Sequence, residues 1–167
     1  FTNFDNTLGV IYIIRDPRNV VTSFSKFKSL TVDKTADFMI NGTGDGLSWT
    51  NNWSVNYQSW KIFKEYQRYL LIKYEDLINK PDKTFLTILE FIHKLNKTNF
   101  ELNKKKFENV IKTTNFNYMQ NLEKEKGFSE SSIDTTGKKI PFFNLGPKND
   151  WRNKLDTEVV EKLEKAF

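Results

Sequence analysis

The clearest hydrophobic pattern in the chain is the unbroken run from Val10 to Ile14. A second run with the same character extends from Leu70 to Tyr74, interrupted only by Lys73. Continuous β-branched, aliphatic and aromatic runs of this length are typical of strands that are covered on both faces in a parallel sheet. We therefore predict that both runs are interior strands of such a sheet.

Helical patterns follow both strands. Asp16 is a good N-cap and Pro17 suits the first helical position, and apolar residues then recur with the spacing of one helix face. This face consists of Val20, Phe24 and Phe27. Pro81 begins another helix, whose stripe consists of Phe85, Ile88, Leu89 and Ile92. Further helical patterns lie near 53–63, 104–112, 116–124 and 156–167. Strands alternating with helices predict an α/β fold with a parallel sheet flanked by helices.

In two segments the apolar residues follow neither the helical nor the strand spacing. Residues 29–52 contain Gly42, Gly44 and Gly46, and residues 126–141 are polar and contain Gly127 and Gly137. We predict loops at both places and expect them to be the most mobile parts of the chain, with the first acting as a lid over a site. The sequence has no repeat and no low-complexity linker, so we treat residues 1–167 as one domain.

Composition narrows the function classes. Of the 167 residues, 38% are hydrophobic and 28% charged, which suits a single globular domain. The longest apolar run is too short to cross a bilayer, and the absence of cysteine is compatible with the cytoplasmic location that we expect. The net charge of +5 suits an anionic ligand. Lysines are dispersed apart from Lys104 to Lys106, which we interpret as a solvated helix face, so no nucleic-acid partner is expected.

The most informative candidate binding residues lie between Arg15 and Ser23, where the first strand leads into its helix. Ligands of open α/β sheets bind at the carboxyl ends of strands, and a helix N-terminus there attracts anions. Arg15 is therefore placed to bind a phosphate, and Ser23 borders the buried helix face. The alternative is that Ser23 bonds back to the carbonyl of Asn19 and that Arg15 forms an ordinary ion pair. Residue patterns alone leave these two interpretations even.

The stretch from Tyr12 to Phe27, with an Arg ending a strand and a Ser eight residues later, resembles the 3′-phosphate-binding motif of the sulfotransferases that use 3′-phosphoadenosine 5′-phosphosulfate (PAPS). Other segments resemble the same family in the same order. They are Trp53 to Trp60, Lys73 to Leu77, Lys112 to Met119, and the loop from Phe142 to Asn153. The resemblance implies a P-loop-kinase-like sulfotransferase fold, with PAPS as co-substrate. It implies nucleotide-binding roles for Arg15, Ser23, Tyr74, Thr114, Phe116 and Gly146.

The chain departs from the family pattern in the last of these segments. Asn144 and Leu145 stand where the family has an Arg-Lys pair that reaches the 3′-phosphate, and Asn149 stands where it has Gly. Losing two cations weakens binding of that phosphate unless Lys138, Lys139 or Lys148 replaces them.

The resemblance also shows what the sequence lacks. The family's phosphosulfate-binding loop and catalytic His precede the Arg motif, and neither is present in these residues. His93 is the sole histidine, and we interpret it as a structural or surface residue. We expect the chain to be the C-terminal portion of a sulfotransferase domain, with no catalytic acid or base and no metal site. Glu75 and Asp76 are interpreted as capping and ion-pairing residues.

The function implied is transfer of a sulfuryl group from PAPS to the hydroxyl or amine of a small-molecule or carbohydrate acceptor. One alternative is a P-loop kinase-like nucleotide enzyme, which shares the sheet architecture but gives no reason for the Thr114 to Phe116 and Asp150-Trp151 segments. The other is a nonenzymatic module that binds polyanions. Such a module predicts salt-sensitive binding to many polyanions, whereas a cofactor site predicts selectivity for the 3′-phosphate.

Overall fold

The computed structural model describes residues 3–42, 52–134 and 136–167. Its residues divide into two compact units, each built from two separate stretches of the chain. Unit 1 comprises Phe1–Arg15 and Val55–Thr113, and unit 2 comprises Asp16–Ser54 and Thr114–Phe167. The boundary between the two units, between Arg15 and Asp16, therefore falls inside the candidate binding motif from Arg15 to Ser23.

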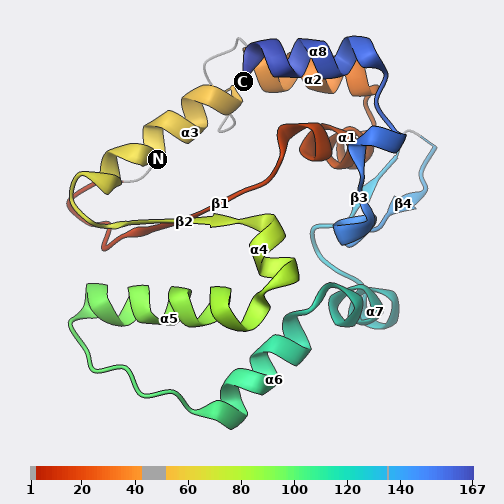
Figure 1. The fold of residues 1–167 in the computed structure, drawn as a ribbon. Helices are drawn as coiled ribbons and strands as arrows, with labels where there is room; N and C mark the ends of the chain where they lie inside the picture. Colours follow the sequence, from red (N-terminus) through yellow and green to blue (C-terminus); the bar gives the residue numbers. More distant parts are fainter. Residues whose placement is uncertain (1–2, 43–51, 135) are drawn as a thin grey trace. The chain divides into compact units, whose positions relative to one another are not determined.

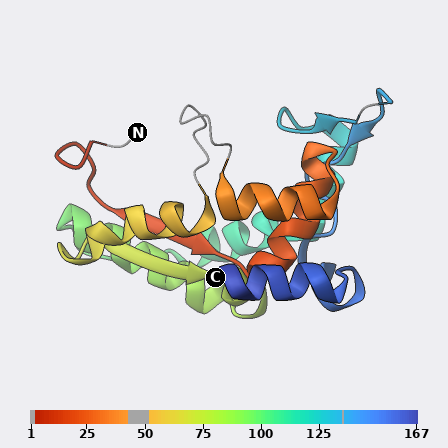
Figure 2. The same cartoon turned by 90° about the horizontal axis from the view of Figure 1, so that it is seen from above.

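Unit 1 is organised around a parallel pair of strands, β1 (Val10–Ile14) and β2 (Tyr69–Lys73). They run side by side in both views, with Val10 opposite Tyr69 and Ile14 opposite Lys73 (Figures 1 and 2). The predicted parallel pairing is confirmed. Within the described residues each strand has one neighbour, so the predicted interior position is not seen. Accordingly Ile13 is 55% exposed, although Ile72 on the adjacent strand is buried.

Helices complete unit 1. Most of α3 (Trp53–Lys61) and the 3-10 turn η1 (Ile62–Lys64) precede β2, and α4 (Tyr74–Asn79), α5 (Pro81–Asn96) and α6 (Lys104–Thr114) follow it. Both α4 and α5 pack on β2. Pro81 occupies the first turn of α5, as predicted. The strand predicted to end at Tyr74 ends one residue earlier, because Tyr74 already begins α4.

Unit 2 is built on three helices, α1 (Pro17–Lys28), α2 (Val32–Asn41) and α8 (Thr157–Ala166), which contact one another pairwise (Figures 1 and 2). Its core consists of Val21, Ala36, Met39, Val159 and Leu163. The fully buried face of α1 carries Val21, Thr22 and Ser25. The predicted stripe is confirmed in part: Val20 and Phe24 are partly buried and pack against this core. The most deeply buried residues lie about one position further along, because α2 and α8 approach α1 from the side of Val21.

The remainder of unit 2 follows Thr114. It contains α7 (Phe116–Lys126), the hairpin strands β3 (Ser132–Ile133) and β4 (Lys139–Ile140), and the 3-10 turns η2 (Gly146–Lys148) and η3 (Trp151–Asn153). The strands of the hairpin pair antiparallel, with Ser132 opposite Ile140. No helix among the described residues is long and apolar enough to span a membrane.

Two loop predictions need correction. Residues 32–41 of the first predicted loop form α2, capped by the Thr31 hydroxyl, which accepts from the Lys34 amide at 3.3 Å. This helix forms because Ala36 and Met39 are buried against α1 and α8. Residues 43–51 of that loop lie outside the described residues. The second predicted loop contains the β3–β4 hairpin. Greater mobility of both segments stays a prediction.

Candidate functional site

The first turn of α1 is fixed by the predicted N-cap. One carboxylate oxygen of Asp16 accepts from the Arg18 backbone N–H at 2.9 Å, and both carboxylate oxygens accept from the Arg18 guanidinium at 3.0 and 2.8 Å. Partial burial alone would raise the pKa of the Asp16 carboxyl, but these hydrogen bonds outweigh it and hold the pKa below its ordinary value. The carboxylate therefore stays charged at the start of the helix, where negative charge is favoured.

Arg15 and Tyr74 meet in unit 1. Arg15 directly follows β1 and Tyr74 directly follows β2, so the parallel register brings both to the same end of the sheet. The guanidinium carbon lies 4.2 Å from the centre of the Tyr74 ring, within the range of a cation–π contact. Burial raises the pKa of Tyr74 although the Arg15 charge opposes it. The Tyr74 hydroxyl thus keeps its proton at neutral pH and can donate to an anion.

Ser23 lies in the second turn of α1, in unit 2. Its hydroxyl donates to the Val20 carbonyl at 3.0 Å and lies 3.4 Å from the Asn19 carbonyl. This is the back-bonded arrangement that the sequence left open as the alternative. The hydroxyl oxygen keeps lone pairs that can accept a further hydrogen bond, and rotation of the O–H can redirect the donor.

Phe116 and Gly146 form a contact in unit 2. Phe116 begins α7, whose N-cap Asn115 accepts from the Tyr118 amide at 2.9 Å. Gly146 begins η2 with a φ of 50°, a left-handed value that favours glycine. A Cβ at this position would overlap the Phe116 ring. The Phe143 ring lies edge-on to Phe116 at 6.1 Å between centroids, so an aromatic surface adjoins the loop.

Thr114 ends α6 and is exposed beside Asn115 and Phe116. Of the departures noted in the sequence, Asn144 is exposed and Leu145 is partly buried. Lys138, Lys139 and Lys148 all have exposed side chains, in the hairpin and η2. Replacement of the missing Arg-Lys pair by any of the three stays a prediction.

Within each unit the structure brings predicted residues together. Arg15 contacts Tyr74 in unit 1, and Phe116 contacts Gly146 in unit 2. Ser23 and Thr114 also belong to unit 2. The nucleotide-binding roles of all of these residues remain predictions.

Polar residues that the sequence did not single out hold the loop from Phe142 to Trp151. Buried Glu123 accepts from the backbone N–H groups of Phe142 and Phe143 at 2.7 and 2.9 Å. Buried Asn149, noted in the sequence merely as a departure, binds α1 through its side chain. The partners lie far apart in the chain, so no local pattern marks these bonds.

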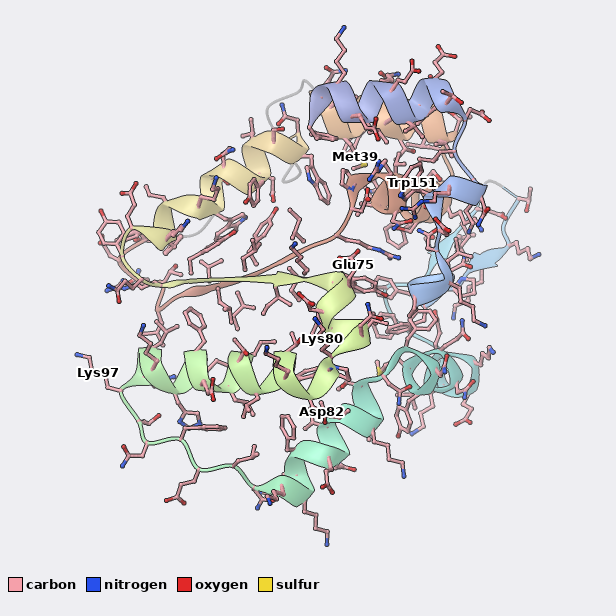
Figure 3. All side chains as sticks on the ribbon, viewed as in Figure 1. Met39, Glu75, Lys80, Asp82, Lys97 and Trp151 are labelled. Atoms are coloured by element: carbon pink, nitrogen blue, oxygen red, sulfur yellow. The ribbon has the colours of Figure 1, made fainter. Side chains whose placement is uncertain are left out.

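His93, Glu75 and Asp76 lie on helices of unit 1. His93 Nδ1 lies 2.7 Å from the Thr98 hydroxyl, and its ring packs on Phe100 at 5.1 Å. Glu75 and Asp76 lie in the first turn of α4, and Asp76 pairs with Lys80 at 3.8 Å. In Figure 3, Glu75 and Lys80 lie on this short helix and the turn that follows it. The contacts of His93 and the ion pair of Asp76 agree with the interpretations made from the sequence, but no side-chain hydrogen bond among the described residues caps α4, so the capping role is not seen.

An open cavity of about 370 Å³ also lies in unit 1, between β2 and the start of α5. Lys73, Lys80 and Lys83 give its lining a positive character. Thr84, its buried polar residue, already bonds the carbonyls of Asp76 and Lys80 at 3.0 and 2.9 Å. None of the residues predicted to bind the nucleotide lines this cavity.

Comparison with solved structures shows the same fold. The chain superposes on mouse sulfotransferase SULT7A1 complexed with PAP with a TM-score of 0.67 at 18% identity, covering 95% of this chain and 56% of that one. Retinol dehydratase in complex with androsterone and inactive cofactor PAP gives a TM-score of 0.65 at 18% identity, covering 94% of this chain and 45% of that one. These neighbours support the α/β sulfotransferase architecture.

The curated proteins that are similar in sequence are also sulfotransferases. Human sulfotransferase 2A1 is 24% identical over 98% of this chain and 56% of its own length. The 3-beta-hydroxysteroid sulfotransferase of Cavia porcellus is 25% identical, with the same coverage, and the amine sulfotransferase of Oryctolagus cuniculus is 21% identical over 54% of its length. The chain thus spans little more than half the length of the relatives it matches.

The family model for the sulfotransferase domain matches residues 2–167, which is nearly the whole chain. This match extends over both units and includes the Arg15 motif and the loop around Gly146. The chain therefore belongs to the sulfotransferase domain family.

Proposed function

We propose that this chain is the C-terminal portion of a PAPS-dependent sulfotransferase and supplies the 3′-phosphoadenosine-binding part of its site. The observation that carries the proposal is the contact between Arg15 and Tyr74, at 4.2 Å from guanidinium carbon to ring centre. The sequence resemblance assigns both residues to the nucleotide independently, from separate motifs. Their meeting at one end of the sheet is what a shared ligand requires.

The donor set fits the proposed co-substrate. Arg15 offers a permanent positive charge to the 3′-phosphate, and the protonated Tyr74 hydroxyl offers a hydrogen bond. Phe116 offers a flat apolar surface suited to a purine ring, next to Thr114. Ser23 can reorient its hydroxyl toward a phosphate oxygen. PAPS bound here would supply the sulfuryl group, and the reaction would release adenosine 3′,5′-bisphosphate.

In the proposed reaction an acceptor oxygen or nitrogen forms a bond to sulfur while the bond from sulfur to the 5′-phosphate oxygen breaks. A base takes the acceptor proton, and cations stabilise the charge that develops on the leaving oxygen. The residues assigned here bind and orient, and none is assigned as that base. We accordingly expect this chain by itself to bind the nucleotide weakly and to show no transferase activity. The acceptor is proposed to be a small molecule or carbohydrate, and the location cytoplasmic.

Calorimetric titration tests the site directly. The chain should bind adenosine 3′,5′-bisphosphate more tightly than adenosine 5′-monophosphate, because the monophosphate lacks the group that Arg15 binds. Arg15→Ala should weaken the bisphosphate by about 1.5–3 kcal/mol, the scale of one charge-assisted hydrogen bond, and leave the monophosphate nearly unchanged. Lys64→Ala, an exposed cation in η1, is the control.

Equal affinity for both nucleotides would contradict the proposal. If the bisphosphate and an unrelated polyanion such as heparin bound equally well and fell off together with rising salt, the polyanion-binding alternative would be favoured. Sulfuryl transfer by the purified chain would show that the catalytic groups lie among these residues after all.

A further inference from the structure

Asn149 is one of few buried polar residues in unit 2, with 4% of its surface exposed. Its side-chain nitrogen donates to the Asn19 carbonyl at 2.7 Å. The same amide lies within hydrogen-bond distance of the Thr22 hydroxyl through both its nitrogen, at 2.7 Å, and its oxygen, at 3.0 Å. Thr22 is equally buried, at 4%. The side chain of Asn149 therefore fastens the end of η2 to the first two turns of α1.

A second bond anchors the next part of the loop to the same helix. The Asn19 side-chain oxygen accepts from the Trp151 backbone N–H at 2.9 Å. Trp151 begins η3, which packs against α1 (Figure 3). Asn19 thus binds Asn149 through its carbonyl and Trp151 through its side chain.

The start of the loop is held from α7. Glu123, 7% exposed, accepts from the amides of Phe142 and Phe143, and the Gln120 side-chain nitrogen donates to the Phe143 carbonyl at 2.8 Å. Gly146 lies between these two anchors, against Phe116. The segment from Phe142 to Trp151 is therefore held at both ends by hydrogen bonds within unit 2.

We propose that Asn149 is a positioning residue that preorganises this loop for the 3′-phosphate end of the nucleotide; this inference rests on the proposed function. The resemblance puts glycine at this position in the family, and glycine can form none of the three side-chain contacts of Asn149. It also puts an Arg-Lys pair where this chain has Asn144 and Leu145. Ordering the loop in advance removes part of the entropy cost of binding. This offsets the loss of electrostatic attraction between an Arg-Lys pair and the 3′-phosphate.

Asn149→Gly, which restores the residue of the family pattern, is the central variant. It should weaken adenosine 3′,5′-bisphosphate by about threefold to tenfold, the range of one neutral hydrogen bond, and leave adenosine 5′-monophosphate unchanged. Hydrogen exchange at the Trp151 amide should become faster in the absence of ligand. A residue that merely stabilises unit 2 would affect both nucleotides equally.

Thr22 provides an independent test with less risk of unfolding. Thr22→Val keeps the side-chain shape but loses the hydroxyl, and should reproduce the selective loss. Thr22→Ser keeps the hydroxyl and should bind like the unchanged chain. In the double variant Thr22→Val with Asn149→Gly, the losses should be less than additive, because both remove the same contact. Asn153→Ala, at the exposed last residue of η3, is the matched control and should have no effect.

The outcomes separate the two proposals. If the unchanged chain prefers the bisphosphate but neither Asn149→Gly nor Thr22→Val alters that preference, the positioning role is overturned and the nucleotide site stands. Equal losses for both nucleotides would also overturn it. If the unchanged chain itself does not distinguish the nucleotides, the proposed function fails and takes this inference with it.

Discussion

The guanidinium carbon of Arg18 lies 4.1 Å from the centre of the Trp151 ring. The same guanidinium pairs with the Asp16 carboxylate at 2.8 Å and with Glu164 of α8. The Arg18 side chain thus connects the N-cap of α1, the end of the loop from Phe142 to Trp151, and α8. These three elements come from opposite ends of the sequence, so Arg18 helps to hold unit 2 in its folded arrangement.

Arg18→Ala should destabilise unit 2 by about 1–3 kcal/mol, because it removes a cation–π contact and charge-assisted hydrogen bonds from a side chain that is 25% exposed. Urea denaturation measures the change. Arg152→Ala is the matched control: its guanidinium also lies near the Trp151 ring, at 4.8 Å, but its side chain is 68% exposed. That variant should change the free energy of unfolding by less than about 0.5 kcal/mol. Equal effects of the two substitutions would contradict the role given to Arg18.

Asp16 makes the stability of unit 2 sensitive to acid. The pKa of its carboxyl is lower in the folded chain than its ordinary value of 3.8, so the charged form favours folding. This contribution is present above the ordinary pKa and is lost as the pH falls through the lowered one. Asp16→Asn keeps a good N-cap but cannot ionise. It should therefore be less stable than the unchanged chain at pH 7, and the difference should shrink as the pH falls below about 4.

A gap between the two unfolding curves that is independent of pH would show that Asp16 acts by capping alone. Asp134→Asn is a useful comparison, because the pKa of this hairpin carboxyl is also lowered, chiefly by the Thr136 hydroxyl. Asp134 lies away from α1 in the sequence and should not affect the contact between Arg18 and Trp151.

The extent to which the sequence predicts this structure depends on whether the determining contacts are local. β1 and the starts of α1 and α5 follow from short apolar runs, an Asp N-cap and Pro17 or Pro81 at first helical positions. The helix α2 also has a local signal, the Thr31 cap and the spacing of Ala36 and Met39, but the glycines that follow it favoured a loop.

The family resemblance supplied the motifs of the candidate site, yet it could not supply their support. Asn149 bonds to Thr22 and Asn19 across most of the chain. Glu123 is likewise separated from Phe142 by the whole hairpin. From the sequence, a charged residue in a polar helix is expected to face solvent. Only the tertiary arrangement shows that Glu123 is buried and that its carboxylate oxygens accept hydrogen bonds from backbone amides.

Tyr69 gives unit 1 a weak point at alkaline pH. Its hydroxyl is buried without a hydrogen-bond partner among the described residues. Burial, together with Tyr57 and Tyr12, raises the pKa of Tyr69 to about 12. A raised pKa means that the stability contribution is complete below the ordinary value of 10.0 and is lost as the pH rises through about 12. Tyr69→Phe should reduce this alkaline loss.

At pH 7 Tyr69→Phe should be neutral or stabilising by up to about 1 kcal/mol, because it removes a buried unsatisfied hydroxyl and keeps the ring. Tyr12→Phe is the contrast: the Tyr12 hydroxyl donates to the Asn56 side chain at 2.8 Å, so its removal leaves a polar partner unsatisfied and should destabilise. Thermal unfolding at pH 7 and pH 11 measures both. A destabilised Tyr69→Phe at pH 7 would mean that its hydroxyl has a partner in solution.

Gly146 should be the least replaceable residue of the loop. Its φ of 50° disfavours any side chain, and a Cβ would overlap the Phe116 ring. Gly146→Ala should therefore destabilise unit 2 by more than about 1 kcal/mol from backbone conformation alone, with the overlap adding to this. Combining it with Phe116→Ala separates the two causes. The double variant removes the ring, so the cost of the alanine measured in the Phe116→Ala background should drop to the backbone part. Urea denaturation of the four chains gives this difference, and an unchanged cost in that background would show that the Phe116 contact does not restrict Gly146.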